Sequence, residues 1–365
     1  MFWSKADIVE RLSRIPRTLE DISIEIFRGV PATNDFLHKE SLSRENCTDA
    51  PYICRNPQSS ISVEQVSIEQ ELMHPYIDSS LSNEFAVNAT QYKYMLPYEI
   101  LGNAIKKDYR IFQPEELEAK FPVAYKELIE IKQKSWPEKQ EAVSVDCYRL
   151  ENESFLQYMK TPKIIITENC HLQASYDPQG SHIFADGVGV VLGDHTLYYY
   201  VTAVLNSSIS KAFPEIWNHE KAQIGIKISP EMLKRFPIIF PKNQNTEILI
   251  STITRYLIYL NRQKYLTKTY SIPGYQDLID FYKRISDLLI LDCYLTNDLD
   301  PKLLDILAEN ITPSEEQFEY SNDISLLIGL QAIKKNILDS PDFRKCKFSN
   351  EFTNILATLK TSNVW

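Results

Sequence analysis

The chain has 365 residues, of which 44% are hydrophobic and 24% charged, a composition typical of a globular protein rather than a disordered one. No segment reaches the roughly 18 consecutive apolar residues that a membrane helix needs, and residues 1–17 carry both charge signs without a long apolar core. We therefore expect a cytoplasmic protein with no membrane contact. The net charge of −10 argues at first against nucleic acid, whose binding proteins usually carry a basic face.

The charge is distributed unevenly along the chain. Residues 61–99 hold six acids and one base, whereas residues 100–139 hold eight bases and seven acids. A local basic face is therefore compatible with an acidic chain. The six cysteines are scattered without a CxxC pair or a zinc-ligand spacing, so we expect reduced thiols and no metal site.

The first third of the chain has the texture of strands and loops. Residues 18–112 alternate short apolar runs with polar stretches rich in turn residues. A helix is then predicted from Pro114, with acids in its first turn and apolar residues at three-to-four spacing as far as Ile131. It is expected to end with Lys132 and Lys134, just before Trp136-Pro137.

The middle of the chain returns to strands. Lys163–Thr167 predicts a β-strand, and residues 182–194 predict a β-hairpin. Residues 196–213 predict a partly buried helix, with Asn206-Ser207-Ser208 near one end of it or facing a close neighbour.

From about residue 246 the apolar spacing is helical. Five helices are predicted, over residues 246–264, 275–295, 301–310, 322–338 and 350–360. Pro241 and the polar residues 242–245 mark the best boundary. The predicted fold class is therefore mixed α/β (α+β), with a β-rich domain over residues 1–245 and a helical region over residues 246–365.

No catalytic motif stands out. Gly187, Gly189 and Gly193 lack the spacing and the following helix of a dinucleotide or S-adenosylmethionine loop, and there is no phosphate-binding GxxxxGK[ST]. Asn56-Pro57-Gln58-Ser59 lacks the second proline and the aromatic residue of an amino-methyltransferase motif. The sequence therefore does not establish whether the chain is an enzyme.

Five separated features do follow a recognisable order. They are Phe27–Phe36 with Leu19–Ile22 before it, Tyr94–Tyr98, Thr161–Ile166, Leu205–Ser208, and Leu233–Ile238 followed by paired helices. This order resembles the TaqI-like C-terminal specificity domain of adenine-specific DNA methyltransferases and restriction–modification enzymes, over roughly residues 15–310. The chain departs from the family at Ala32-Thr33-Asn34, where the family usually has Thr-Gly. In that family a methyltransferase domain normally precedes this module, and we expect this chain to be a recognition module without it.

The resemblance implies a target recognition domain that binds double-stranded DNA. It also implies a separate methyltransferase subunit, and possibly a nuclease subunit, as partners. No cofactor is expected in this chain, and S-adenosylmethionine is expected on the methyltransferase. Adenine methylation requires the base to leave the stack, so another part of the assembly must hold the flanking duplex.

Ten residues are of the type that such a module uses. Arg28, Thr33 and Asn34 suit base reading in the major groove, since arginine pairs with guanine and asparagine with adenine. The others suit anchoring to the DNA backbone: Lys106, Lys107, Arg110, Lys132, Lys134, Trp136 and Lys163. For each lysine, a solvated surface charge is the simpler interpretation, and for Asn206-Ser207 it is helix packing or capping.

Two other functions remain open. The chain could be a helical interaction or assembly factor of a defence complex that does not itself read DNA. It could also be an enzyme in its own right, although the missing motifs disfavour this.

Overall fold

A computed structural model gives the fold. It describes residues 5–30, 68–77, 84–87, 93–135, 145, 148–150, 153–168, 172–185, 187–210, 228–266, 274–296, 299–314 and 318–345. Within these residues the chain mixes short sheets with helices, which confirms the predicted α+β class. No helix in the described ranges is long and apolar enough to cross a bilayer.

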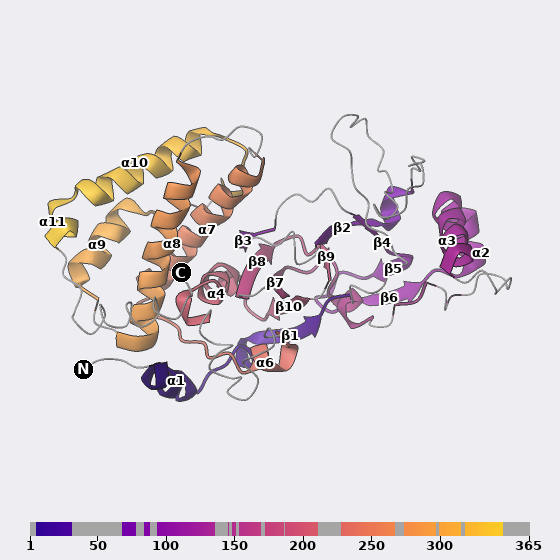
Figure 1. Cartoon of the computed structure of the whole chain (residues 1–365), viewed down its shortest axis with the longest axis horizontal. Coiled ribbons are helices and arrows are strands. Elements are labelled where there is room, and N and C mark those ends of the chain that lie inside the picture. The colour runs from indigo at the N-terminus through magenta and orange to yellow at the C-terminus, as the bar shows by residue number, and fades with distance from the viewer. Residues whose placement is uncertain are drawn as a thin grey trace.

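Helices dominate both ends of the molecule (Figure 1). Up to residue 243, the described helices are α1 (Lys5–Ser13), α2 (Pro114–Lys120), α3 (Pro122–Ser135), α4 (Tyr198–Leu205) and α6 (Pro230–Lys234). The C-terminal region contains α7 (Gln244–Leu266), α8 (Tyr275–Leu291), α9 (Pro301–Asn310), α10 (Ser325–Asp339) and α11 (Pro341–Lys345). Figure 1 shows α7–α11 gathered at one end of the long axis and α2–α3 at the other, with the strands between them.

The central sheet has five strands in the order β1-β10-β7-β8-β3. They are β1 (Ser23–Arg28), β10 (Gly187–Leu192), β7 (Lys163–Glu168), β8 (Leu172–Asp177) and β3 (Phe85–Ala86). All neighbours are antiparallel except β3, which runs parallel to β8. Two smaller sheets flank it. One has the order β4-β2-β9 (Lys93–Met95, Met73–Ile77 and Ile183–Phe184), and the other joins β5 (Tyr98–Leu101) to β6 (Asp108–Ile111).

The central sheet separates two hydrophobic cores. In β7, Ile164 and Ile166 face the core that includes α4, α7 and α8, whereas Ile165 faces the core beneath β2, β4 and β9. Side chains of a strand alternate between its faces, so a strand covered on both sides reads as a continuous apolar run. This explains the sequences of β7 and β10. The first core contains residues from both sides of position 245, and the domain boundary there stays a prediction.

The helix predicted from Pro114 is two helices. α2 ends at Lys120 and α3 begins at Pro122, with Phe121 between them in a non-helical conformation (φ −133°, ψ 62°). A proline disfavours helical geometry in the residue before it, which explains the break. The apolar spacing continues across the break because both helices pack on the second core through Leu117, Ala124 and Leu128.

The hairpin predicted over residues 182–194 is wrong. Its two strands enter different sheets: β9 pairs with β2, and β10 lies between β1 and β7. Partner strands distant in the sequence supply the hydrogen bonds that a hairpin would have made locally. Other predicted elements are confirmed. The strand Lys163–Thr167 is confirmed as β7, and four predicted C-terminal helices are confirmed as α7–α10. The helix predicted over residues 350–360 lies outside the described residues.

Candidate nucleic-acid interface

Three turns that are distant in the sequence meet near one group of lysines. The first turn joins β5 to β6 over residues 102–107, the second precedes β7 at Lys160-Thr161-Pro162, and the third follows β8 at residues 178–182. Lys106, Lys107, Lys160 and Lys163 belong to these turns or border them, and we call them the basic turn cluster. Lys106 and Lys160 are exposed, whereas Lys107 and Lys163 are buried.

Lys107 ties the first turn to the second. Its ammonium donates to the Ala104 carbonyl at 2.9 Å and to Thr161 Oγ1 at 3.0 Å. The Thr161 hydroxyl in turn donates to the Ile105 carbonyl at 2.9 Å. Burial, together with the charge of Lys160, lowers the pKa of Lys107. The side chain of Lys107 therefore holds the β5–β6 turn in place and does not present its ammonium at the surface.

Lys163 ties the second turn to the third. Its ammonium lies 3.2 Å from Asp177 Oδ2 and donates to the Gly180 carbonyl at 2.5 Å. His182 approaches the same carboxylate, with Nδ1 3.2 Å from Asp177 Oδ1. Gly180 has φ +63°, and a Cβ there would lie 2.0 Å from the Thr161 carbonyl oxygen, so only glycine fits.

The charges of Lys163, Asp177 and His182 affect one another. Burial alone would raise the pKa of Asp177, but Lys163 and His182 outweigh it and hold that pKa well below its usual range. Burial lowers the pKa of Lys163, and Asp177 acts in the opposite direction. Nearby, burial and the charges of Lys160 and Lys163 lower the pKa of His74 to about 4. His74 is therefore neutral at pH 7.

The structure brings three of the ten predicted DNA-binding residues together: Lys106, Lys107 and Lys163. Only Lys106 among these three is exposed, because Lys107 and Lys163 face the interior. Lys160, Thr161, Asp177 and His182 belong to the same assembly but were not predicted as site residues. The turn sequence Asp177-Pro178-Gln179-Gly180 was the available signal, since it predicts a tight turn after β8.

The remaining predicted residues lie elsewhere or outside the described residues. Arg28 is exposed at the end of β1. Arg110 in β6 is engaged by two acids: its Nε lies 2.6 Å from Glu99, and its two terminal nitrogens lie 2.7 and 2.8 Å from Glu116. Lys132 and Lys134 lie in α3, and their side chains are outside the part of the chain that the structure describes. Thr33, Asn34 and Trp136 lie outside the described residues.

The motif residue Asn206 has a structural role. It caps the C-terminal end of α4, and its Oδ1 accepts from the Ala174 N–H at 3.0 Å while its Nδ2 donates to the Ala174 carbonyl at 2.7 Å. The side chain thus pairs with β8 as a further strand would. This confirms that Asn206 lies at a helix end and faces a close neighbour.

Residues of three other motifs also form hydrogen bonds between distant segments. The Leu19 N–H donates to the Phe236 carbonyl at 2.8 Å, and Ile238 N–H donates to the Arg17 carbonyl at 2.9 Å. The Tyr198 hydroxyl donates to the Pro162 carbonyl at 2.6 Å. Leu19, Pro162, Asn206 and Phe236 therefore each hold together segments that are distant in the sequence.

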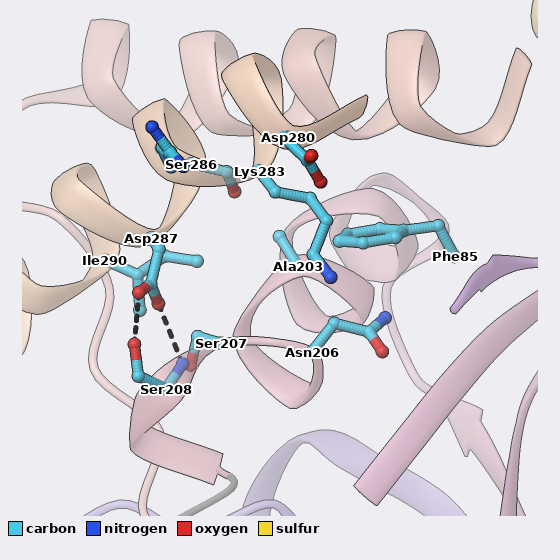
Figure 2. A pocket seen from close by; sticks show the side chains of 11 residues that line it. Phe85, Ala203, Asn206, Ser207, Ser208, Asp280, Lys283, Ser286, Asp287 and Ile290 are labelled. Atoms are coloured by element: carbon cyan, nitrogen blue, oxygen red, sulfur yellow. Dashed lines mark hydrogen bonds between the residues drawn. The ribbon is translucent and has the colours of Figure 1, made fainter. Parts of the chain in front are cut away.

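A separate cavity of about 340 Å³ lies between the end of α4, β3 and α8 (Figure 2). Figure 2 shows Asp287 of α8 accepting hydrogen bonds from the backbone N–H and the hydroxyl of Ser208. Lys283, on the same helix, forms an ion pair with Glu84, the residue before β3. These contacts join α8 to the end of α4 and to the start of β3. Among the described residues, no group of three or more histidines, cysteines or acids is arranged to hold a metal ion.

Comparisons with known proteins give little. No family model matches the chain, and no curated protein matches it. One solved structure that matches is that of the Type IIL restriction-modification enzyme MmeI in complex with DNA, at 9% identity and a TM-score of 0.34. The match covers 73% of this chain and 31% of that chain, so this chain spans less than a third of that enzyme's length. A TM-score this low does not identify a shared fold.

Proposed function

We propose that this chain is a sequence-specific DNA-recognition module of a restriction–modification system. The observation that carries the proposal is the basic turn cluster. Lysines from segments 54 residues apart gather around turns that Lys107 and Thr161 hold together, on a chain whose net charge is −10. Exposed lysines on a fixed backbone suit phosphate contacts, which set the register of a protein on DNA.

The ordered motifs support the same proposal. In the family that the sequence resembles, these motifs follow one another along a specificity domain. Here Asn206, Pro162 and Phe236 each take part in a hydrogen bond between segments that are distant in the sequence. A set of residues with such roles depends on the whole fold, so its order along the chain is a stronger signal than any single motif.

The catalytic step would belong to a partner. Methylation of adenine in a duplex needs a base-flipping active site, and the sequence of this chain carries no methyltransferase motif. We infer a separate adenine methyltransferase subunit that binds S-adenosylmethionine, with this chain holding the flanking duplex. A nuclease subunit would complete a system that also cleaves DNA.

The test is selection from a randomised duplex pool at several salt concentrations, with and without a candidate methyltransferase subunit. We expect enrichment of one sequence and an affinity whose logarithm falls linearly with the logarithm of salt, by about 0.9 per phosphate contact. A pool that stays random under both conditions would contradict sequence-specific recognition.

The second candidate is an assembly factor that does not read DNA. The observation that favours it is the start of α10, where Ile324, the residue before the helix, and Ile328 are 52% and 66% exposed. Exchanging Lys106 and Lys160 for glutamine separates the two candidates. A DNA reader loses affinity for every sequence, whereas an assembly factor keeps its complex.

A further inference from the structure

Two large aliphatic side chains are exposed at the β5–β6 turn: Leu101, the last residue of β5, and Ile105 within the turn. All six residues from Leu101 to Lys106 are exposed, and Leu101 and Ile105 are 38% and 41% exposed. The other side chains of the loop are small or polar, namely Gly102, Asn103, Ala104 and Lys106. Removing these two side chains from water on binding would be favourable.

The loop is held rigidly from beneath. The Lys107 ammonium binds the Ala104 carbonyl, and the Thr161 hydroxyl binds the Ile105 carbonyl. The Lys107 N–H also donates to the Gln157 carbonyl at 2.8 Å. Gly102 supplies the φ of +79° that turns the chain after Leu101. A loop fixed in this way loses little conformational entropy when it binds.

The exposed lysines near Leu101 and Ile105 point to DNA as the ligand that covers these side chains. Lys106 lies in the loop itself, and exposed Lys160 lies close enough for its charge to act on Lys107. Architectural DNA-binding proteins combine these two properties: cations hold the phosphates while an aliphatic side chain enters between base pairs from the minor groove. A protein partner with an acidic surface is the competing occupant.

We propose that Leu101 and Ile105 form a wedge that inserts between base pairs of the bound duplex, while Lys106 and Lys160 hold the flanking phosphates. This inference rests on the proposed function and adds a mode of recognition to it. A wedge unstacks one base step at the cost of distorting the duplex, so the protein would prefer flexible pyrimidine–purine steps at that position.

The experiment compares wild-type protein with Leu101→Ser/Ile105→Ser on the enriched duplex, carrying a fluorescent adenine analogue whose emission rises on unstacking. We expect the emission rise to be lost and the affinity for the enriched sequence to fall about tenfold, with non-specific affinity changed by less than about twofold. Leu101→Met/Ile105→Leu keeps the aliphatic volume and should keep the emission rise.

The matched control is Ile24→Ser/Leu338→Ser, because these side chains are 41% and 39% exposed but lie on β1 and α10. This variant should behave as wild type. If wild-type protein binds the enriched duplex and Leu101→Ser/Ile105→Ser gives the same emission and affinity, the wedge is overturned while DNA recognition stands. If Leu101→Ser/Ile105→Ser loses methyltransferase binding but keeps its DNA binding, Leu101 and Ile105 contact the protein partner instead of the DNA. Absence of any wild-type DNA binding would overturn both proposals.

Discussion

The Lys163 ammonium and the Asp177 carboxylate lie 3.2 Å apart in the interior, where both side chains are at most 2% exposed. The pair joins the start of β7 to the end of β8, and His182 and the Gly180 carbonyl complete its hydrogen bonding. An ion pair without access to water depends on each partner, since either charge alone would be costly to bury.

Removing Lys163 should destabilise the fold. In Lys163→Met the carboxylate of Asp177 loses its neighbouring charge, and we expect the free energy of unfolding to drop by about 3–5 kcal/mol in urea denaturation. Lys163→Met/Asp177→Leu should recover much of this loss, because neither charge is then buried alone. Lys106→Met, at an exposed position of the same cluster, should change stability by less than about 0.5 kcal/mol. A loss as large as that of Lys163→Met would refute the burial argument.

His74 should make stability depend on pH. Its pKa is about 4 in the folded state and about 6.5 in the unfolded state, so the unfolded chain binds more protons between these values. The stabilisation is therefore present above about pH 6.5 and is lost as the pH falls toward 4, by about 3 kcal/mol in total. Urea denaturation at about pH 7 and about pH 5 should show this slope in wild type and a shallower one in His74→Gln. Equal slopes in the two proteins would exclude His74 as the source.

Asn206 should matter more than its neighbour in the sequence. Asn206→Ala leaves the Ala174 N–H and carbonyl without the amide that binds them, and it also removes the 2.9 Å bond to the Thr202 carbonyl. We expect a loss of about 2–4 kcal/mol in thermal or urea unfolding, because buried backbone groups are left unpaired. Ser207→Ala is the matched control, since its buried hydroxyl donates only to the Val204 carbonyl of α4. If both variants lower the free energy of unfolding equally, the Asn206–Ala174 hydrogen bonds contribute no more than the Ser207 hydroxyl.

The exposed lysines and Arg110 should differ in DNA binding. Lys106→Gln and Lys160→Gln should each weaken binding to all sequences and reduce the salt slope by about 1. Arg110→Gln should have a smaller effect, because Glu99 and Glu116 already engage its guanidinium. Fluorescence anisotropy across a salt titration measures both quantities. An Arg110 effect equal to that of Lys106 would mean that DNA displaces these acids.

The sequence predicted elements better than it predicted their partners. The helical spacing of residues 246–338 gave α7–α10, because an amphipathic helix is encoded by residues a few positions apart. The strand at Lys163 was also predictable from its β-branched run. The hairpin at residues 182–194 failed because β9 and β10 pair with β2, β1 and β7, which no local pattern specifies.

For the candidate site as well, the sequence predicted residue types but not their exposure. Residue type alone indicated which lysines suit DNA, and the order of the motifs indicated a recognition module. Only the tertiary structure decided that Lys106 and Lys160 face water while Lys107 and Lys163 hold turns together. Whether a lysine is exposed or buried depends on contacts with segments far along the chain, such as Thr161 for Lys107 and Asp177 for Lys163. The sequence by itself fixes the chemical groups and their local periodicity, and the packing of distant segments assigns each group its role.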